Sequence, residues 1–351
     1  MIISVSGTGA TGASAVVGLL EACNIQSYKY TVEFQLLIEP DGILDLYHFL
    51  VEDTRRLSCS TAIGRFRDNI YSSRNRSIAK ATNNEFYKIS EDYIDSITQI
   101  SWMGRSGMDP VDQQAFLDSS KFRLFNIAIR KFLRLFNPKQ VWPPYKERYF
   151  SILDDIEFKA KTQDYIKKLF LVSGFDLNKP ILLEQLFPTT DPLEGSEFFD
   201  DDVRSVVVER DPRDLFIHTN FFSRQNCGFM PNSGNVNDFI IYYKDLHRNR
   251  VEDSRVKYVQ FEDLIFKYED TSKELMDWLG LEECGGKSHF DPRKSINNTK
   301  MFVNYPELAK DIEIIETELS DYLYPFEEME MQIDFKRGQC KPFTQAQSIK
   351  M

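Results

Sequence analysis

The sequence predicts an α/β protein with a central parallel sheet, and three observations support this class. An apolar, strand-like run at residues 2–5 leads through a glycine-rich turn into a helix-like run at residues 13–22. In the second half of the chain, β-branched runs alternate with helical patterns, which favours parallel strands joined by crossover helices. The chain has 351 residues and 42% hydrophobic content, enough for one large domain. We therefore expect a single domain spanning residues 1–351.

The turn at residues 6–12 has the features of a phosphate cradle. Gly7, Gly9 and Gly12 let the backbone bend tightly and come close to a ligand. The first N–H groups of the following helix lack partners and face outward at the positive end of the helix dipole. The turn therefore predicts an anion site, and a purely structural glycine turn is the alternative.

Two phosphate-binding motifs overlap in this turn. Gly7-x-x-x-x-Gly12-Ala13-Ser14 has the spacing of a P-loop but carries Ala13 where a nucleotide triphosphatase has lysine, so ordinary NTP hydrolysis is not expected. Gly7-x-Gly9-x-x-Gly12 also fits the dinucleotide fingerprint, which needs an acidic residue about 20 residues further on. Glu33 lies near that position, so a Rossmann-type NAD(P)-dependent oxidoreductase stays open.

Residues 28–38 (YKYTVEFQLLI) alternate aromatic and β-branched side chains and predict the second strand, closed by a turn at residues 39–42. Glu33 lies inside this strand. A carboxylate there, next to a phosphate cradle, can act as a general base. The alternative is a surface glutamate on an edge strand.

Residues 43–136 show mainly helical spacing and predict a helical insertion at about residues 43–150. Residues 102–110 and 142–145 interrupt it as loops. Four arginines in this part are interleaved with Phe66 and Tyr71 and could line an anionic pocket, or they could form a solvated helix face. These arginines are Arg65, Arg67, Arg74 and Arg76.

The second half of the chain predicts alternating strands and helices. The expected strands are residues 180–185, 203–209 and 257–260, and the expected helices are residues 156–172, 236–247 and 262–279. Arg210 follows the most strand-like run of the chain, 203–209. Ligands of open parallel sheets collect at the carboxyl ends of the strands, so Arg210 is a candidate ligand-binding residue. The alternative is a surface salt bridge to Asp214.

Composition excludes several classes of function. A net charge of −11 argues against a nucleic-acid-binding surface. The chain enters its first strand at once and has no long apolar segment, so we expect neither a signal peptide nor a membrane span, and a cytoplasmic location. The five cysteines lack C-x-x-C spacing and the four histidines lack ligand spacing, so we expect reduced thiols and no metal site.

Four blocks of sequence, in this order, resemble the PAPS-dependent sulfotransferase family. They are the glycine-rich loop after the first strand, VVVERDPRDL at residues 206–215, YVQFEDL at 258–264 followed by a helix ending WLGL, and FDPRKSINNT at 290–299 with the helix after it. The last block is similar to the end of bacterial glycan and capsule sulfotransferases. The resemblance covers the N-terminus and roughly residues 181–325 but not the helical middle.

The resemblance implies a P-loop-containing nucleotide hydrolase-like, three-layer α/β/α fold that binds 3′-phosphoadenosine 5′-phosphosulfate (PAPS). It places the opening loop on the 5′-phosphosulfate and Arg210 on the 3′-phosphate, where its rigid donor fork suits a phosphate. Ser295, Asn298 and Thr299 are implied to close over the nucleotide. The loop residues that cradle the 5′ end by this resemblance are Gly9, Ala10, Thr11, Gly12, Ala13 and Ser14.

Two positions depart from the family. Ala10 stands where the family has lysine or arginine, and losing a cation that neutralises the leaving phosphate can cost about a hundredfold in rate. Arg65, Arg67 and Arg105 are candidate replacements. His218 stands where the family has serine; it can still donate a hydrogen bond to a phosphate but would make affinity depend on pH.

These residues predict transfer of a sulfuryl group to an acceptor hydroxyl, with a carbohydrate as the expected acceptor and no metal. Glu33 is the first candidate for the base that removes the hydroxyl proton, and His48 is the second. A degenerate member of the fold that binds nucleotide or glycan without catalysis is the non-enzymatic alternative, and Ala10 supports it.

Overall fold

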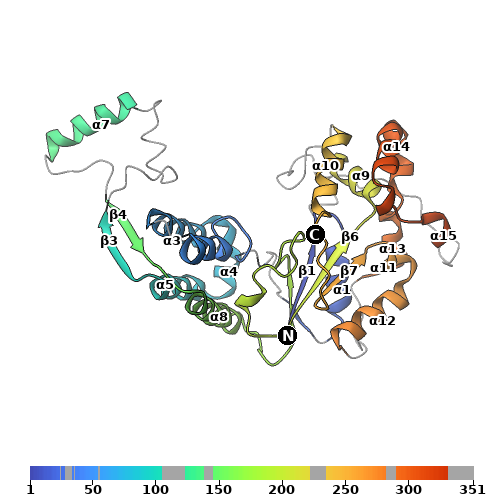
Figure 1. Cartoon of the computed structure of the whole chain (residues 1–351), viewed down its shortest axis with the longest axis horizontal. Helices are drawn as coiled ribbons and strands as arrows, with labels where there is room; N and C mark the ends of the chain where they lie inside the picture. Colours follow the sequence, from blue (N-terminus) through green and yellow to red (C-terminus); the bar gives the residue numbers. More distant parts are fainter. Residues whose placement is uncertain are drawn as a thin grey trace. The chain divides into compact units, whose positions relative to one another are not determined.

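The computed structural model describes residues 1–23, 25–27, 34, 36–53, 56–104, 123–137, 145–221, 235–281 and 290–330. The chain divides into two compact units (Figure 1). The first comprises Met1–Lys29, Leu177–Ser196 and Asp201–Met351, and the second comprises Tyr30–Asp176 and Glu197–Asp200. The insertion expected at about residues 43–150 falls inside the second unit.

The first unit contains a parallel five-stranded sheet in the order β2-β5-β1-β6-β7. The strands are β1 Ile2–Gly7, β2 Gln26–Ser27, β5 Ile181–Glu184, β6 Val203–Glu209 and β7 Val256–Gln260. The predicted P-loop-like α/β class is confirmed: the central strand β1 leads through the glycine turn into a helix. Gly7 pairs with Val208 and Glu209 with Gln260, so the segments after β1, β6 and β7 lie at one edge of the sheet.

Eight helices of the first unit are described. They are α1 Ala13–Leu20, α9 Pro212–Phe221, α10 Val236–Leu246, α11 Asp263–Phe266, α12 Tyr268–Leu279, α13 Pro292–Ser295, α14 Ala309–Glu318 and α15 Phe326–Glu330. Helices α1, α11 and α12 bury apolar side chains, including Val16, Leu264 and Leu275, in one core cluster together with Val5 of β1 and Val206 of β6. Helices α9, α10 and α14 form a second apolar cluster beside the strand ends.

Most strand and helix predictions for the second half are close to the structure. Residues 203–209 form β6 with the bounds expected, because the valines and serine of that run are buried in the centre of a parallel sheet while Arg204 and Glu209 stay partly exposed. The helix expected at residues 262–279 is instead two helices, since the backbone leaves the helical region at Lys267. The strand expected at residues 28–38 is wrong for 36–38, which form a turn, while residues 28–33 and 35 lie outside the described residues.

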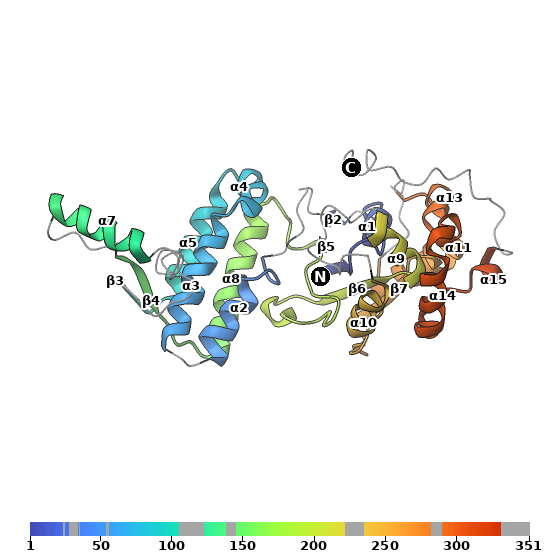
Figure 2. The same cartoon turned by 90° about the horizontal axis from the view of Figure 1, so that it is seen from above.

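The second unit combines helices with an antiparallel hairpin (Figure 2). Its helices are α2 Ile43–Tyr47, which continues as a π-helix over His48–Glu52, and α3 Arg56–Ile70, α4 Arg76–Ala81, α5 Glu85–Ile97, α7 Arg123–Phe136 and α8 Asp155–Val172. Its strands are β3 Ile100–Gly104 and β4 Lys146–Phe150. The loop expected at residues 102–110 is therefore wrong for its first three residues, which belong to β3.

Stacked and hydrogen-bonded tyrosines join α5 to α8 in the core of the second unit. The Tyr93 and Tyr165 rings stack with centroids 4.3 Å apart. Each hydroxyl finds a buried partner: Tyr93 bonds Thr162 at 2.8 Å and Tyr165 bonds Ser90 at 2.7 Å. Burial raises the pKa of both tyrosines, so they stay neutral at any physiological pH.

Two further sequence expectations concern cysteines and the membrane. Cys59 is a buried free thiol, but Cys23 is disulfide-bonded, so the expectation of reduced thiols is wrong for Cys23.

Across the described segments, no helix combines the length and the apolar character that crossing a bilayer requires. The same segments contain no cluster of three or more side chains suited to a metal ion.

Candidate functional site

The turn between β1 and α1 is sterically specific. Gly12 adopts a left-handed conformation with φ 97°, and a Cβ at this position would lie 2.3 Å from the Phe261 ring. A Cβ on Gly7 would lie 2.1 Å from Thr11 Oγ1. The glycines at these two positions are therefore required by close packing of the turn, and at Gly12 also by the backbone conformation.

The turn presents a row of unpaired donors. Among the described residues, none accepts a hydrogen bond from the backbone N–H groups of Gly9 through Ser14. The Thr11 hydroxyl is buried and also has no partner in this part of the chain. These groups surround the N-terminus of α1, where the helix dipole favours negative charge. The turn thus has the donors and the field of an anion cradle.

Arg210 connects the turn to the segment after β6. Its Nη1 donates to the carbonyl oxygen of Ala10 at 2.7 Å, and its Nη2 donates to the carbonyl of Asn298. The guanidinium lies over the Phe261 ring at 5.2 Å, and the residue is 5% exposed. The predicted turn, Arg210 and the segment around Asn298 therefore meet at one place. A surface salt bridge to Asp214 is not what the structure shows.

The rest of the RDPRD motif is an internal clamp. Asp211 is fully buried and accepts hydrogen bonds from Arg213 and from the N–H of Tyr324. Arg213 also donates to Glu316 at 2.9 Å. Asp214 accepts from the N–H groups of two residues after α13, Lys300 and Met301, both at 2.6 Å. These bonds fix the C-terminal segments against the strand end that carries Arg210.

Of the three residues expected to close over the nucleotide, the structure brings Asn298 into contact with Arg210. Asn298 contacts Arg210 through its carbonyl, as described above. The Thr299 hydroxyl is buried and donates to the carbonyl of Ile296 at 2.8 Å. Ser295 ends α13. Their roles toward a nucleotide stay predictions.

His218, the residue at the predicted serine position, lies in α9. Burial and the charge of Arg210 lower the pKa of its imidazole to about 4, so the ring is neutral at pH 7. An anion bound beside it would raise that pKa again, because the protonated ring would gain an opposite charge.

We therefore expect adenosine 3′,5′-bisphosphate to bind with uptake of a proton by His218 at mildly acidic pH. The bound pKa exceeds the free value of about 4, so affinity rises as pH falls between the two pKa values, by at most about tenfold per pH unit. Calorimetry in buffers of different ionisation enthalpy measures this uptake. His218→Asn should remove it; equal uptake by both proteins would contradict the assignment.

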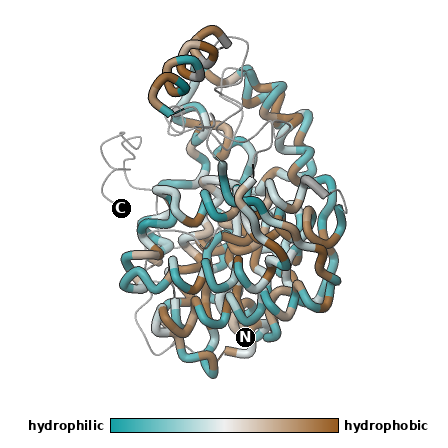
Figure 3. The backbone as a smooth tube through the Cα atoms, turned by 90° about the vertical axis from the view of Figure 1, so that its left-hand side faces the viewer, coloured by the Kyte–Doolittle hydropathy of each residue, from teal (hydrophilic) through white to brown (hydrophobic). Residues whose placement is uncertain are grey.

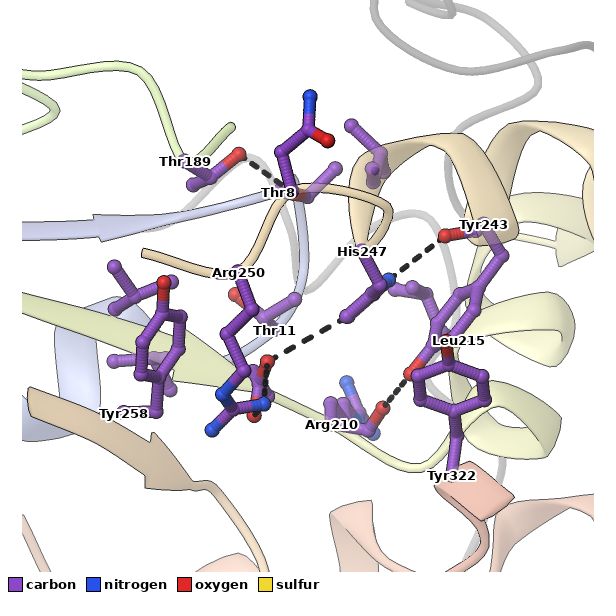
Figure 4. A pocket seen from close by; sticks show the side chains of 15 residues that line it. Thr8, Thr11, Thr189, Arg210, Leu215, Tyr243, His247, Arg250, Tyr258 and Tyr322 are labelled. Carbon is purple, nitrogen blue, oxygen red and sulfur yellow. Dashed lines mark hydrogen bonds and ion pairs between the residues drawn. The ribbon is translucent and has the colours of Figure 1, made fainter. Parts of the chain in front are cut away.

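A cavity of about 150 Å³ lies beside the turn (Figure 4). Its lining includes Thr8 and Thr11 from the turn, Arg210, and side chains from the end of β6 and from α10 and the loop after it. The Thr8 and Thr189 hydroxyls lie 3.2 Å apart on one wall. Because Thr8 and Arg210 both line it, the cavity adjoins both ends of the candidate anion site.

His247, at the C-terminus of α10, lies in this cavity with a defined ring orientation. Its Nδ1 lies 2.8 Å from the carbonyl oxygen of Tyr243, which can only accept, so Nδ1 carries the proton. Nε2 is then the basic nitrogen, 3.7 Å from a carboxylate oxygen of Glu209. The ring stacks on Tyr243 with centroids 4.2 Å apart and is held in place.

Glu209 is the acidic residue of the cavity. Its side chain is 15% exposed, and both carboxylate oxygens accept from Nη1 of Arg250, at 3.0 and 3.2 Å. The Arg250 guanidinium in turn lies 3.8 Å from the centroid of the Tyr258 ring. The arrangement of Glu209, Arg250 and Tyr258 was not predicted from the sequence. The sequence feature that could have indicated Glu209 is its position as the last residue of β6, directly before Arg210 and at the edge of the sheet where ligands bind.

The remaining predicted residues are not part of this site as described. Glu33 and Arg105 lie outside the described residues. His48 belongs to the second unit, where its side chain is exposed and bonds Glu52 at 2.8 Å. Arg65 and Arg67 also belong to the second unit; both are ion-paired and line an open cavity of about 490 Å³ together with Tyr71. The catalytic role of Glu33 and His48 stays a prediction.

Solved structures that are similar to this chain include two sulfotransferase domains. The sulfotransferase domain from the Synechococcus PCC 7002 olefin synthase is 12% identical with a TM-score of 0.37, over 80% of this chain and 74% of that chain. The sulfotransferase domain from the curacin biosynthetic pathway is 13% identical with a TM-score of 0.38, over 92% of this chain and 98% of that chain. No protein-family model and no curated protein matches this chain.

Proposed function

We propose that this protein transfers a sulfuryl group from PAPS to an acceptor hydroxyl, with a carbohydrate as the acceptor. The observation that carries the proposal is the meeting of the glycine turn with Arg210, two segments 200 residues apart, through the bond from Arg210 to the Ala10 carbonyl. One ligand with anionic groups at both ends fits this arrangement, and the four sequence blocks indicate which ligand it is.

The site has hydrogen-bond donors for both phosphate groups of a bisphosphorylated nucleotide. The N–H groups from Gly9 to Ser14 and the Thr11 hydroxyl hold the 5′ end. At the other end, Arg210 Nε is buried and has no partner among the described residues, so the guanidinium keeps a donor for the 3′-phosphate. When bound, the nucleotide supplies the sulfuryl group and leaves as adenosine 3′,5′-bisphosphate.

His247 is the proton acceptor within the first unit. With Nδ1 donating to Tyr243, Nε2 takes the proton of an acceptor hydroxyl as the hydroxyl oxygen bonds to sulfur and the bond from sulfur to the 5′-phosphate oxygen breaks. Glu209 stabilises the imidazolium that forms. Arg250, which lines the same cavity as Thr8, supplies the cation that Ala10 cannot.

A carbohydrate suits the cavity by its chemistry. Threonine hydroxyls can donate to and accept from sugar hydroxyls, and the Glu209 carboxylate can accept from them, while the ring of Tyr322 offers apolar surface to the C–H face of a sugar.

One alternative is a degenerate member that binds the nucleotide without transfer, and Ala10 favours it. A Rossmann-type oxidoreductase is disfavoured by topology, because β5 lies between β1 and β2. In the classic dinucleotide-binding order the second strand is next to the first.

The test combines binding and turnover. We expect calorimetry to show micromolar or tighter binding of adenosine 3′,5′-bisphosphate, at least tenfold tighter than ATP or NADPH, because only the bisphosphate reaches both ends of the site. Incubation with ³⁵S-labelled PAPS and a panel of glycans should yield a labelled product. Tight binding with no product from any acceptor would support the degenerate alternative, and preferred binding of NADPH would reject the proposal.

A further inference from the structure

Helix α7, Arg123–Phe136, exposes an unusual amount of apolar surface. Six large apolar side chains on this one helix are more than two-fifths exposed, and the most exposed are Leu124 at 82% and Leu135 at 80%. The others are Phe125, Ile127, Phe132 and Phe136. Isolated exposed hydrophobic residues are normal, but a gathering of this kind marks a binding surface.

The sequence of α7 separates apolar from basic residues by helical spacing. At about 100° per residue, the phenylalanines and leucines at positions 124, 125, 132, 133, 135 and 136 fall on one half of the helix. The basic residues Lys131 and Arg134 fall on the other half. Only Ile127 departs from this division. Figure 3 shows α7 at the top of the view with hydrophobic and hydrophilic stretches alternating along it.

The charge of α7 is opposite to that of the protein. The helix contains four basic and no acidic residues, whereas the whole chain has a net charge of −11. In Figures 1 and 2 it lies beyond the β3–β4 hairpin and does not pack on α3, α5 or α8. Its apolar half is therefore not used in the core of its own unit.

We propose that α7 binds the surface of an anionic lipid bilayer, lying in the plane of the interface. A strong apolar half beside a basic half with low overall hydrophobicity is the pattern of interfacial helices. At 14 residues α7 is about 21 Å long, too short to cross a hydrocarbon core of about 30 Å. The basic residues select anionic headgroups, and the apolar half distinguishes a bilayer from a nucleic acid, which would need only the charges.

The experiment is co-sedimentation of the full chain with vesicles of phosphatidylcholine alone or with one third phosphatidylglycerol. We expect binding to the anionic vesicles and at least tenfold weaker binding to the neutral ones, with strong weakening in 1 M salt. Leu135→Glu and Phe132→Glu should each lower the partition coefficient at least tenfold. Lys131→Gln combined with Arg134→Gln should lower it by roughly thirtyfold on anionic vesicles.

Ile156→Glu is the matched control, since Ile156 is 79% exposed at the start of α8 and not on α7; it should bind like the unmodified chain. The proposal would be overturned if the unmodified chain bound neither kind of vesicle. It would also be overturned if Leu135→Glu bound the anionic vesicles as strongly as the unmodified chain. A dimer, detected by light scattering, that Leu135→Glu dissociates without any vesicle binding would overturn it as well. None of these outcomes depends on nucleotide binding or sulfuryl transfer.

Discussion

Replacing Arg210 with alanine is expected to lower the affinity for adenosine 3′,5′-bisphosphate by at least a hundredfold. A charged, forked donor to a phosphate contributes about 1.5–3 kcal/mol or more when it is buried. The substitution also removes the bond to the Ala10 carbonyl, so the turn at the other end of the site loses its anchor. Both effects weaken binding, and isothermal titration calorimetry measures their sum.

Two companion variants separate charge from fold. Arg210→Lys keeps the charge but not the fork, and should recover only part of the affinity. Arg204→Ala, in the strand β6 that leads to Arg210 but paired with Asp202 at the surface, should bind normally. Because Arg210 is buried, thermal unfolding must accompany the titration; the carbonyls left unpaired cost about 1–3 kcal/mol each. A folded Arg210→Ala protein that binds as tightly as the unmodified chain would reject the site.

Replacing His247 with glutamine is expected to lower the rate of sulfuryl transfer by about a hundredfold to ten-thousandfold while leaving nucleotide affinity nearly unchanged. Glutamine can still donate to the Tyr243 carbonyl but cannot accept a proton.

A purely structural role for His247 would give a different pattern. It would lower the thermal stability and kcat together. Lys244→Gln is the control, because Lys244 lies on the same helix and pairs with Glu318 at the surface; it should retain full activity. If His247→Gln retains full kcat and Glu33→Gln or His48→Gln loses it, the base is one of the residues expected from sequence.

The sequence predicted the parts of the site that depend on local geometry. The glycine turn follows from spacing alone, and Arg210 follows from its place at the end of the most strand-like run. The family resemblance implied that Asn298 closes over the nucleotide, whereas its contact with Arg210 through the backbone carbonyl was not predicted and is seen only in the structure. The residues of the cavity could not be predicted from the sequence, because His247 and Glu209 are 38 positions apart and come together only when α10 packs beside β6.

The sequence was least informative where the same residues allow two structures. Lys267 sits inside a helical pattern and breaks it with φ −128° and ψ 39°, although lysine is a good helix former, so intrinsic propensity alone does not predict the break. In the same way, Trp102 and Met103 looked like loop residues beside a glycine, yet they pair with Arg148 and Glu147 across the hairpin. The pairing partner is more than 40 residues away, and no local pattern carries that information.

The Arg213 clamp sets an order on how the protein is made. Arg213 and Asp211 are bonded to Glu316 and Tyr324, which follow them by about a hundred residues in the chain. A nascent chain that has been synthesised only as far as β7 contains all five strands of the sheet described above. It still lacks Glu316 and Tyr324, so Arg213 and Asp211 cannot make their bonds to these residues. The candidate site therefore becomes complete only after residues 316–324 have been synthesised, and a chain that lacks them should fold incompletely and be retained by chaperones.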